Sequence, residues 1–548
     1  DFGCHVDGYA SDMTRTVVIG PPSREVEQVY ETVRAAQEAA LAIARAGITA
    51  AELDQAARAV IEAAGWGEYF THSLGHGVGL QVHEWPRIAS GNEEVLPAGA
   101  VVTIEPGIYL PGRFGIRIED LIVLKPDGHE NLTHLPRTLR MAKFARYLPD
   151  YGWEPIVLTV HPGGYFAYDE TLLAEVKAAG VSIHRTLSLD PTRLFRGRKP
   201  VPLPAESIRR RWSRLNGWLF IPDNKIGWLP PAVWTGRRLI RSAPIDVIFA
   251  SAPPATALLI GALLHRWSGR PLVLDYRDDW LENPRQIYPT RWHRRLHARL
   301  ERWTLRHAAC VTTINSYLQQ AIARRIPPGG PSVHVIPHGF DPADFEAVAP
   351  EPRSDRKLRL LYSGVFYDAQ QPDDFLRALA RWLAEQPEAR AHIEAVFVGL
   401  VPPHTPALID RLGLHDVVTL RGYLPHREAI AALKAADVLW MTVGEQPGAA
   451  GISTSKLFEY IGTRKPILAL IPEGVGRQVL AEYGAAYLTP PHDVEAIVQA
   501  LQRLYEDWKG DRLPVGNASI VARYDRRRLA GQLAALLEET LQQTCKSA

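Results

Sequence analysis

Apolar side chains recur at helical spacing near the start of the chain. Residues 23–46 and about 51–64 each carry such a stripe, and each stretch is followed by a glycine. This pattern predicts two amphipathic helices, the first with Ser23 as its N-cap. Residues 9–20 are typical of a short strand that ends in a turn, and strand-like segments broken by glycines continue to about residue 135.

After residue 139 the pattern changes to short apolar runs that alternate with longer amphipathic stretches. This alternation predicts parallel strands joined by helices, as in doubly wound sheets. Residues 349–357 are charged and contain proline, which predicts a linker between two lobes. The predicted strands are residues 156–160, 247–250, 272–275, 311–314, 334–336, 358–362, 395–398, 417–420, 438–441 and 467–471.

Composition narrows the class of protein. The chain has 548 residues, of which 46% are hydrophobic and 22% charged, as in ordinary globular proteins of about three domains. Three widely separated cysteines argue against a disulfide framework and favour a reducing compartment. No apolar run reaches the roughly 18 residues that span a bilayer. We therefore expect a cytoplasmic protein. Because the chain begins with Asp-Phe-Gly rather than Met, we expect a fragment without a signal peptide.

The net charge of +2 conceals two oppositely charged parts. Residues 1–140 hold 11 Lys and Arg against 19 Asp and Glu, whereas the remaining residues carry a net charge of +10. This division indicates two separate modules. A basic second module is compatible with anionic nucleotides or an anionic membrane surface, and equally with a basic surface that has no partner. No feature of the sequence points to nucleic acid.

One group of acidic and histidine residues in the first 137 positions has the character of a metal site. Four carboxylates and one imidazole suit a pair of divalent cations such as Mn²⁺, Co²⁺ or Zn²⁺, which share and activate a water molecule. Any one of these residues alone is more often structural than a ligand, and the hypothesis depends on their occurring together. The candidate ligands are Asp1, Asp12, His76, Glu105 and Glu119.

The local sequences around these residues resemble the creatinase-like metallopeptidases with the pita-bread α+β fold, specifically the Xaa-Pro aminopeptidase and prolidase branch. The resemblance covers residues 1–137. It implies the five metal ligands above, two divalent ions and a peptide substrate with proline at its second position. It also implies substrate-binding and proton-handling roles for His72 and His83, a place beside the metals for Arg117, and pocket positions for Glu84 and Tyr109. In the family, further residues of the same domain precede the position of Asp1, so we expect a truncated domain with a weakened site.

A second group of motifs lies after residue 357. Ser363-Gly364 follows a predicted strand, where glycine lets the backbone approach a diphosphate. Ser455 and Lys456 lie near a predicted helix N-terminus, which favours phosphate through its amides, its dipole and the lysine charge. Glu459, one turn later, is positioned to accept hydrogen bonds from ribose or sugar hydroxyls. Each feature alone is equally compatible with an ordinary turn or a solvated side chain.

The ordered series of motifs resembles the retaining glycosyltransferases of family 4, which have the two-lobed GT-B fold with two Rossmann-like parallel sheets. Residues 138–345 match the acceptor lobe and residues 346–548 the donor lobe. The resemblance implies a nucleotide-diphosphate sugar as donor, a glycan or lipid-linked acceptor, polysaccharide or glycolipid assembly, and no metal. It assigns donor binding, with Glu459 also catalytic, to Ser363, Gly364, Arg421, Ser455, Lys456 and Glu459.

This sequence departs from the family pattern in three respects. Gly451 stands where the first glutamate of the family's pair is expected, and Val365 and Phe366 occupy a stretch that often carries Arg and Lys. We also expect the first strand and the Gly-rich loop of the acceptor lobe to be missing before residue 138. Three hypotheses follow: a glycosyltransferase, a metal-dependent Xaa-Pro aminopeptidase, or a truncated chimera without catalysis. The basic stretch Arg209–Phe220 either contacts an anionic membrane or packs as a helix of the acceptor lobe.

Overall fold

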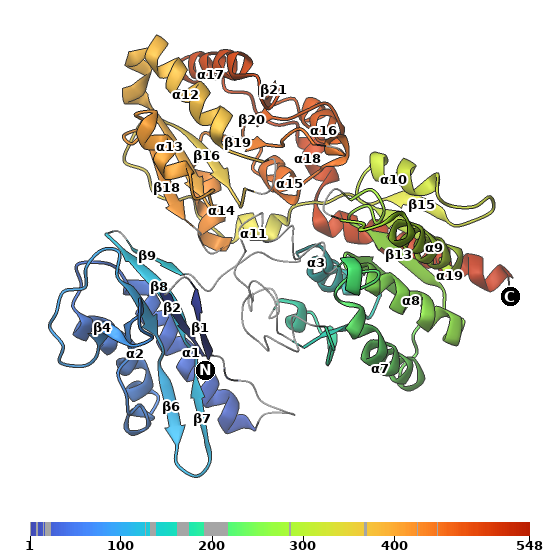
Figure 1. Cartoon of the computed structure of the whole chain (residues 1–548), viewed down its shortest axis with the longest axis horizontal. Coiled ribbons are helices and arrows are strands. Elements are labelled where there is room, and N and C mark those ends of the chain that lie inside the picture. The colour runs from blue at the N-terminus through green and yellow to red at the C-terminus, as the bar shows by residue number, and fades with distance from the viewer. Residues whose placement is uncertain are drawn as a thin grey trace. The chain divides into compact units, whose positions relative to one another are not determined.

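The chain divides into two compact units, the first built on residues 1–137 and the second on the residues that follow (Figure 1). The computed structural model describes residues 2–6, 9–14, 16, 23–126, 128–131, 139–161, 175–190, 217–283, 286–366, 370–422, 424, 426–446 and 448–547. Asp1, residues 132–137 and residues 209–216, on which parts of the sequence predictions fall, lie outside these ranges. Each unit is described by itself.

Two helices form one layer of the first unit. Helix α1 spans Arg24–Ile43 and helix α2 spans Ala50–Ala63. The Ser23 side chain accepts a hydrogen bond from the backbone of Val26, which confirms the predicted N-cap. Thr49 and Glu52 form a reciprocal capping box at the start of α2.

The helices share a hydrophobic core with a mainly antiparallel β-structure. A five-stranded sheet has the order β4-β3-β5-β8-β9, and β1–β2 and β6–β7 form two further antiparallel pairs. This α+β arrangement agrees with the predicted fold class. The strands are β1 (Phe2–Val6), β2 (Tyr9–Met13), β3 (Gly75–Gly77), β4 (Glu84–Ile88), β5 (Val101–Ile104), β6 (Gly107–Leu110), β7 (Phe114–Arg117), β8 (Asp120–Lys125) and β9 (Gly128–Asn131).

The first lobe of the second unit contains two parallel sheets among its described residues. Strand β10 pairs with β11, and a four-stranded sheet has the order β12-β13-β14-β15. The strands are β10 (Ile156–Val160), β11 (Ser182–Thr186), β12 (Ile248–Ala252), β13 (Leu272–Tyr276), β14 (Cys310–Thr313) and β15 (Ser332–Val335). The helices include α3 (Leu139–Tyr147), α7 (Leu229–Ser242), α8 (Ala255–Ser268), α9 (Arg291–His307), α10 (Ser316–Ala323) and α11 (Pro342–Glu346).

The second lobe is a doubly wound parallel sheet of six strands in the order β18-β17-β16-β19-β20-β21. Large aromatic and aliphatic side chains fill both faces of this sheet. The strands are β16 (Leu358–Ser363), β17 (Ile393–Val398), β18 (Val418–Gly422), β19 (Val438–Thr442), β20 (Ile467–Leu470) and β21 (Ala486–Thr489). The helices are α12 (Asp373–Glu385), α13 (Thr405–Arg411), α14 (His426–Ala435), α15 (Ser455–Gly462), α16 (Val475–Tyr483), α17 (Val494–Lys509) and α18 (Ala518–Arg523).

The C-terminal helix α19 (Arg526–Ser547) returns from the second lobe to the first. Its residues Leu529 and Leu533 share a buried cluster with Phe144 of α3 and Val273 of β13. The two lobes are therefore joined at the linker and again through this helix (Figure 1). Among the described residues, no helix combines the length and the apolar character that crossing a membrane requires.

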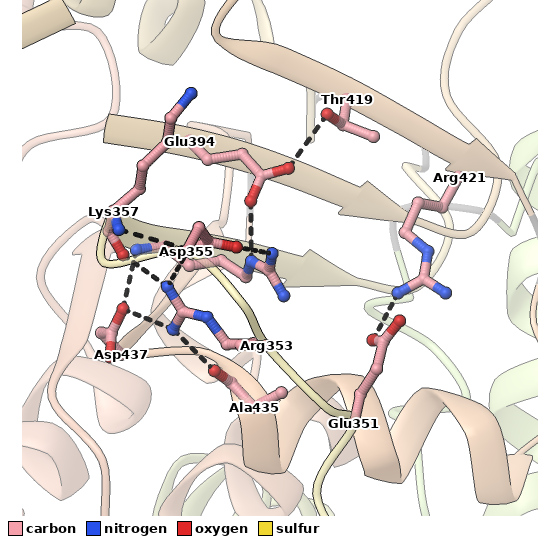
Figure 2. Close-up of polar contacts among 10 residues, drawn as sticks. Glu351, Arg353, Asp355, Lys357, Glu394, Thr419, Arg421, Ala435 and Asp437 are labelled. Atoms are coloured by element: carbon pink, nitrogen blue, oxygen red, sulfur yellow. Dashed lines mark hydrogen bonds and ion pairs between the residues drawn. The ribbon is translucent and has the colours of Figure 1, made fainter. Parts of the chain in front are cut away.

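The predicted linker is held firmly against the second lobe (Figure 2). Arg353 donates hydrogen bonds to the Asp437 carboxylate at 2.8 Å and to the Ala435 carbonyl at 3.0 Å. Arg359, at the start of β16, bonds to Glu394 at the start of β17 at 2.7 Å. These contacts gather at the amino ends of the strands, opposite the edge where ligands of doubly wound sheets bind.

Candidate metal centre and candidate donor site

His76 lies at the centre of the candidate metal site in the first unit. It occupies β3 between two glycines that have no room for a side chain. A Cβ on Gly75 would lie 1.9 Å from the Thr103 carbonyl oxygen, and one on Gly77 would lie 2.1 Å from that of Trp85. The glycines therefore allow β3 to sit tightly between its neighbours, which fixes the position of the His76 ring.

The His76 ring is directed at two of the predicted carboxylate ligands. Its Nδ1 donates to the Gly77 carbonyl at 3.0 Å, so Nε2 faces Glu105 at 3.2 Å and Asp12 at 3.7 Å. Burial lowers the pKa of His76, but the hydrogen bond to Glu105 and the nearby negative charges raise it above its ordinary value overall. In a site that holds a divalent cation, the His76 ring would instead be neutral, and its Nε2 lone pair would bind the cation.

Glu119 completes the group of buried acids. It follows β7 and accepts a hydrogen bond of 2.5 Å from the Thr14 hydroxyl. Burial, together with the charge of Glu105, raises the pKa of Glu119 to about 7. Ligand atoms of His76, Glu105 and Glu119 lie within 4.8 Å of one another, and so do those of Asp12, His76 and His83. Such crowding of like charges is relieved by a cation, so the described residues fit a divalent metal.

The remaining predicted residues of this site surround the acids. The His83 ring lies 4.1 Å from that of His76. Arg117 donates to Thr14 at 2.9 Å and lies 3.7 Å from Glu105. The His72 Nδ1 atom donates to the Ser73 carbonyl, and its buried Nε2 atom has no hydrogen-bond partner within the part of the chain that the structure describes.

The two pocket candidates differ in their surroundings. The Tyr109 ring lies 5.5 Å from that of His72, and its hydroxyl accepts a hydrogen bond from Arg117 at 3.4 Å. Glu84 is exposed and accepts a hydrogen bond from the backbone of Gln81, so it stabilises the turn that carries His83. The structure thus brings together four of the five predicted ligands, and Asp1 lies outside the described residues.

The candidate donor site lies at the carboxyl ends of the strands of the second lobe. Lys456 is the second residue of α15, and its ammonium group lies 3.9 Å from the centroid of the Tyr362 ring and donates to the Tyr362 hydroxyl. Burial lowers the pKa of Lys456 to about 7, although the charge of Glu459 opposes this shift. A lysine that titrates near neutrality beside a helix N-terminus is suited to an anionic ligand.

Glycines bring the backbone close to this lysine. Gly364 has a φ of +134°, and a Cβ on it would lie 2.7 Å from Cε of Lys456. Gly399, at the end of the neighbouring strand, has a φ of +118°, and a Cβ there would lie 2.0 Å from the Gly364 carbonyl oxygen. Both positions require glycine, because only glycine adopts this backbone conformation at such short distances.

The other predicted donor residues hold different positions. The Ser363 backbone amide donates to the Tyr460 hydroxyl at 2.7 Å, which ties β16 to α15. Ser455 is exposed at the first position of α15, and Glu459 is half-buried one turn later. Arg421 forms an ion pair of 2.6 Å with Glu351 of the linker (Figure 2). Because Arg421 lies near the carboxyl end of β18, this ion pair is separate from the Arg353 contacts at the amino ends of the strands (Figure 2).

Two residues near this site were not singled out by the sequence analysis. Asn315 of the first lobe donates to the Gly451 carbonyl at 2.9 Å and to the Ser453 hydroxyl at 3.0 Å, just before α15. Arg526 is buried, and burial lowers its pKa to about 10 while Glu459 opposes the shift. Asn315 follows a predicted strand, so its position at a strand end was a usable signal. Arg526 carries no local signal of this kind.

The Asp275 carboxylate joins secondary-structure elements of the first lobe. It is fully buried at the end of β13 and accepts hydrogen bonds from Ser251 at 2.7 Å, Thr312 at 2.8 Å and Arg140 at 3.1 Å. Burial would raise the pKa of this carboxyl, but Arg140 and the two hydroxyls hold it below its usual range. The carboxylate therefore links the ends of three parallel strands to helix α3.

The chain thus combines two kinds of candidate site: a carboxylate–histidine cluster that fits a divalent metal on an α+β scaffold, and a lysine at a helix N-terminus in a two-lobed unit with parallel sheets. Residues 1–126 match the family model of metallopeptidase family M24. Residues 138–339 match that of the glycosyl transferase 4-like domain, and residues 357–507 that of glycosyl transferases group 1. The chain therefore contains a segment similar to M24 metallopeptidases, followed by two segments similar to glycosyltransferase domains, which confirms both resemblances.

Two of the curated relatives of the first unit are Xaa-Pro dipeptidases. That of Lactobacillus delbrueckii subsp. lactis is 51% identical over 141 residues, which are 26% of this chain and 38% of the relative. That of Pyrococcus horikoshii is 52% identical over 139 residues, which are 25% of this chain and 40% of the relative. The chain thus spans about two fifths of the length of these relatives.

Two solved structures are similar to different shares of the chain. The X-Pro aminopeptidase from Thermotoga maritima MSB8 is 55% identical, with a TM-score of 0.24, over 25% of this chain and 39% of that one. The sucrose-phosphate synthase from Thermosynechococcus elongatus is 17% identical, with a TM-score of 0.48, over 71% of this chain and 99% of that one.

Proposed function

We propose that the second unit transfers a sugar from a nucleotide-diphosphate donor to a hydroxyl group of a glycan or lipid-linked acceptor. We further propose that residues 138–345 form the acceptor lobe and residues 346–548 the donor lobe. The observation that carries this proposal is the position of Lys456, whose partly buried ammonium lies at a helix N-terminus beside the backbone of Gly364.

In this proposal the bond between the sugar and the diphosphate breaks, and a bond forms from the sugar to the acceptor oxygen. The acceptor proton passes to the departing diphosphate. Lys456 and the amides at the start of α15 stabilise the negative charge that develops on the leaving group. Glu459 accepts hydrogen bonds from ribose or sugar hydroxyls. Ser363, Gly364 and Ser455 border the diphosphate, and Arg421 contributes a positive charge at the edge of the same lobe. Retention of configuration is proposed from the match to the glycosyl transferase 4-like domain.

Release of UDP or GDP from a panel of nucleotide sugars tests this function. Lys456→Ala is expected to lower the rate about a hundredfold or more, as when one donor that stabilises a developing negative charge is removed. Lys177→Ala is a matched control, because Lys177 is an exposed lysine of the other lobe. Equal rates for wild type and Lys456→Ala would refute the role given to this lysine.

A second function, metal-dependent cleavage of peptides with proline at the second position, is proposed for the first unit. It is favoured by the crowding of His76, Glu105 and Glu119 around one point. Asp12, His76, Glu105 and Glu119, together with Asp1, would hold two divalent ions, which polarise a carbonyl and activate water when bound. His72 and His83 would orient the substrate and move protons, and Arg117 would hold Glu105 in place.

Calorimetric titration with Mn²⁺ tests the metal centre without requiring turnover. Stoichiometric binding is expected for the wild type, and His76→Ala is expected to abolish it. His415→Ala, which removes an exposed histidine of the second unit, serves as the control. Binding that survives His76→Ala would show that the ion is held elsewhere.

A further inference from the structure

Helix α9 of the first lobe carries an unusual concentration of positive charge. Its 17 residues include six arginines and one acid, Glu301. Glu301 is buried and paired at 3.2 Å with Arg325, which lies in the turn after α10, so it does not neutralise the outer face of α9. All six arginines are exposed.

Five of these arginines form a single stripe. Their spacing of four, four, three and four residues places them within about 80° of one another around the helix and along about 22 Å of its length. The buried side chains of α9, including His293, His297 and Thr304, lie on the opposite face. The arginine stripe consists of Arg291, Arg295, Arg299, Arg302 and Arg306.

The arginine stripe lacks nearby counter-charges in the described part of the chain. Among the described residues, the sixth arginine, Arg294, forms an ion pair with Glu282 at 2.8 Å, whereas no carboxylate lies within 4.0 Å of the stripe. Like charges at helical spacing repel one another and destabilise a helix. Such a surface is therefore suited to an anionic partner that spans the length of the helix.

Large apolar side chains stand beside one end of the arginine stripe. Trp292 is 61% exposed, and Trp218 and Leu219 are 58% and 65% exposed. The rings of Trp218 and Trp292 lie 4.9 Å and 5.1 Å from the His293 ring, so both tryptophans gather at the N-terminal end of α9. Exposed tryptophan next to arginine is typical of surfaces that enter the headgroup layer of a bilayer.

We propose that α9 and the adjoining Trp218–Leu219 segment dock the protein on an anionic lipid surface. The arginine stripe contacts the charged headgroups, and Trp218, Leu219 and Trp292 enter the boundary between headgroups and acyl chains. A nucleic acid or another polyanion would use the same charges but gives no reason for the exposed apolar residues. The inference does not depend on the proposed transfer reaction, since docking is measured without donor or acceptor.

Co-sedimentation with lipid vesicles tests this docking surface. The full chain is mixed with vesicles of phosphatidylcholine alone and with vesicles in which part of the lipid is phosphatidylglycerol. Binding is expected only to the second kind and is expected to weaken as salt increases. The stripe variant is expected to bind about a hundredfold more weakly, because each arginine near an anionic surface contributes to binding. In the stripe variant, glutamine replaces Arg291, Arg295 and Arg299.

A matched control removes the same charge from the second lobe. The control variant carries Arg356→Gln, Arg411→Gln and Arg503→Gln, all at exposed positions, and is expected to bind vesicles as the wild type does. A third variant, Trp218→Ala with Trp292→Ala, is expected to lose the part of the binding that persists at high salt. Unchanged thermal unfolding confirms that each variant is folded.

Three results would overturn the docking proposal. In the first, the stripe variant and the control variant bind anionic vesicles equally. In the second, the wild type binds vesicles of phosphatidylcholine alone as well as it binds those with phosphatidylglycerol. In the third, a single-stranded oligouridylate would bind through the stripe at concentrations where anionic vesicles do not, which would make the surface a nucleic-acid site.

Discussion

Lys456 connects local sequence with the proposed chemistry most directly. A short strand ends at Ser363, a glycine with positive φ follows, and the lysine side chain lies across that glycine. Tyr362 supplies both an aromatic face and a hydroxyl to the ammonium group. Desolvation by these neighbours, rather than a positive neighbour, lowers the lysine pKa to about 7.

Donor binding should therefore depend on pH in a defined direction. A diphosphate favours the protonated form of Lys456, so binding takes up a proton above pH 7. The affinity for UDP is expected to fall as the pH rises from 7 to 9, by up to about tenfold per unit. Calorimetry in buffers of different ionisation enthalpy measures both the affinity and the proton uptake. An affinity for UDP that does not change over this range would contradict the assignment.

The lowered pKa of Lys456 also affects the free energy of unfolding, which rises with pH where the affinity for UDP falls. Between pH 7 and the unfolded lysine value of 10.5, the unfolded chain binds a proton that folded Lys456 does not. Stability from this group therefore rises with pH across that window and does not change below it. Lys456→Met is expected to remove this contribution, which denaturant unfolding of the second unit at several pH values measures. The idea fails if both proteins show the same pH dependence.

Short motifs in the sequence predict the candidate residues of both sites but not their partners in space. His76, Glu105, Gly364 and Lys456 occur in short motifs whose spacing fixes their neighbours along the chain. The contacts of Asn315 with residues 451 and 453 join segments more than 130 residues apart, so no local pattern predicts them. Arg421, predicted as a phosphate contact, forms an ion pair with Glu351, a partner 70 residues away that no local pattern predicts.

At the scale of elements, the ends of β16 and β17 shape the candidate donor site. Gly364 and Gly399, which follow these strands, let the two backbones approach more closely than any residue with a side chain would allow. The strands themselves were predicted closely, because each is a short, buried apolar run. The two described strands of the second unit that the sequence pattern does not predict, β11 and β21, are short or polar, with the sequences Ser-Ile-His-Arg-Thr and Ala-Tyr-Leu-Thr. Pairing within a sheet, rather than local pattern, stabilises such segments.

Gly399→Ala tests the strand-end geometry. The new Cβ would meet the Gly364 carbonyl oxygen, which is backbone and cannot turn aside. We expect a loss of about 3 kcal/mol in unfolding free energy and loss of UDP binding. Gly413→Ala is the control, because Gly413 also has a positive φ but has open space around it, so only about 1 kcal/mol is lost and UDP binding remains. If both changes lowered stability and UDP binding equally, the close approach of Gly399 to Gly364 would not matter for the donor site.

The hydrogen bonds of Arg353 and Arg359, which hold the linker at the amino ends of the strands, predict an effect on stability alone (Figure 2). Arg353→Ala removes hydrogen bonds to Asp437 and Ala435, and the half-buried Asp437 carboxylate loses its ion pair while it keeps the hydrogen bond from the Arg359 backbone amide. A destabilisation of about 2–3 kcal/mol is expected, measured by denaturant unfolding. Arg356→Ala, three residues away and exposed, is expected to be nearly neutral. UDP affinity is expected to stay unchanged in both variants, since these hydrogen bonds lie at the opposite edge of the sheet.

On the scale of the whole molecule, two units with different chemistry share one chain. Their separation at residue 137 appears in the contacts, in the charge distribution and in the family matches. A ligand that binds one folded unit stabilises that unit alone. Differential scanning calorimetry is therefore expected to show two transitions, one raised by Mn²⁺ and the other by UDP. A single transition raised by both ligands would show that the units unfold together.

Binding of UDP and GDP to the purified chain, followed by calorimetry, tests diphosphate recognition by the second lobe most directly. Micromolar affinity is expected for at least one of the two nucleotides. We expect Lys456→Ala to abolish this binding and Lys177→Ala to leave it intact. Failure of the wild type to bind either nucleotide, or equal binding by Lys456→Ala, would contradict the proposed donor site.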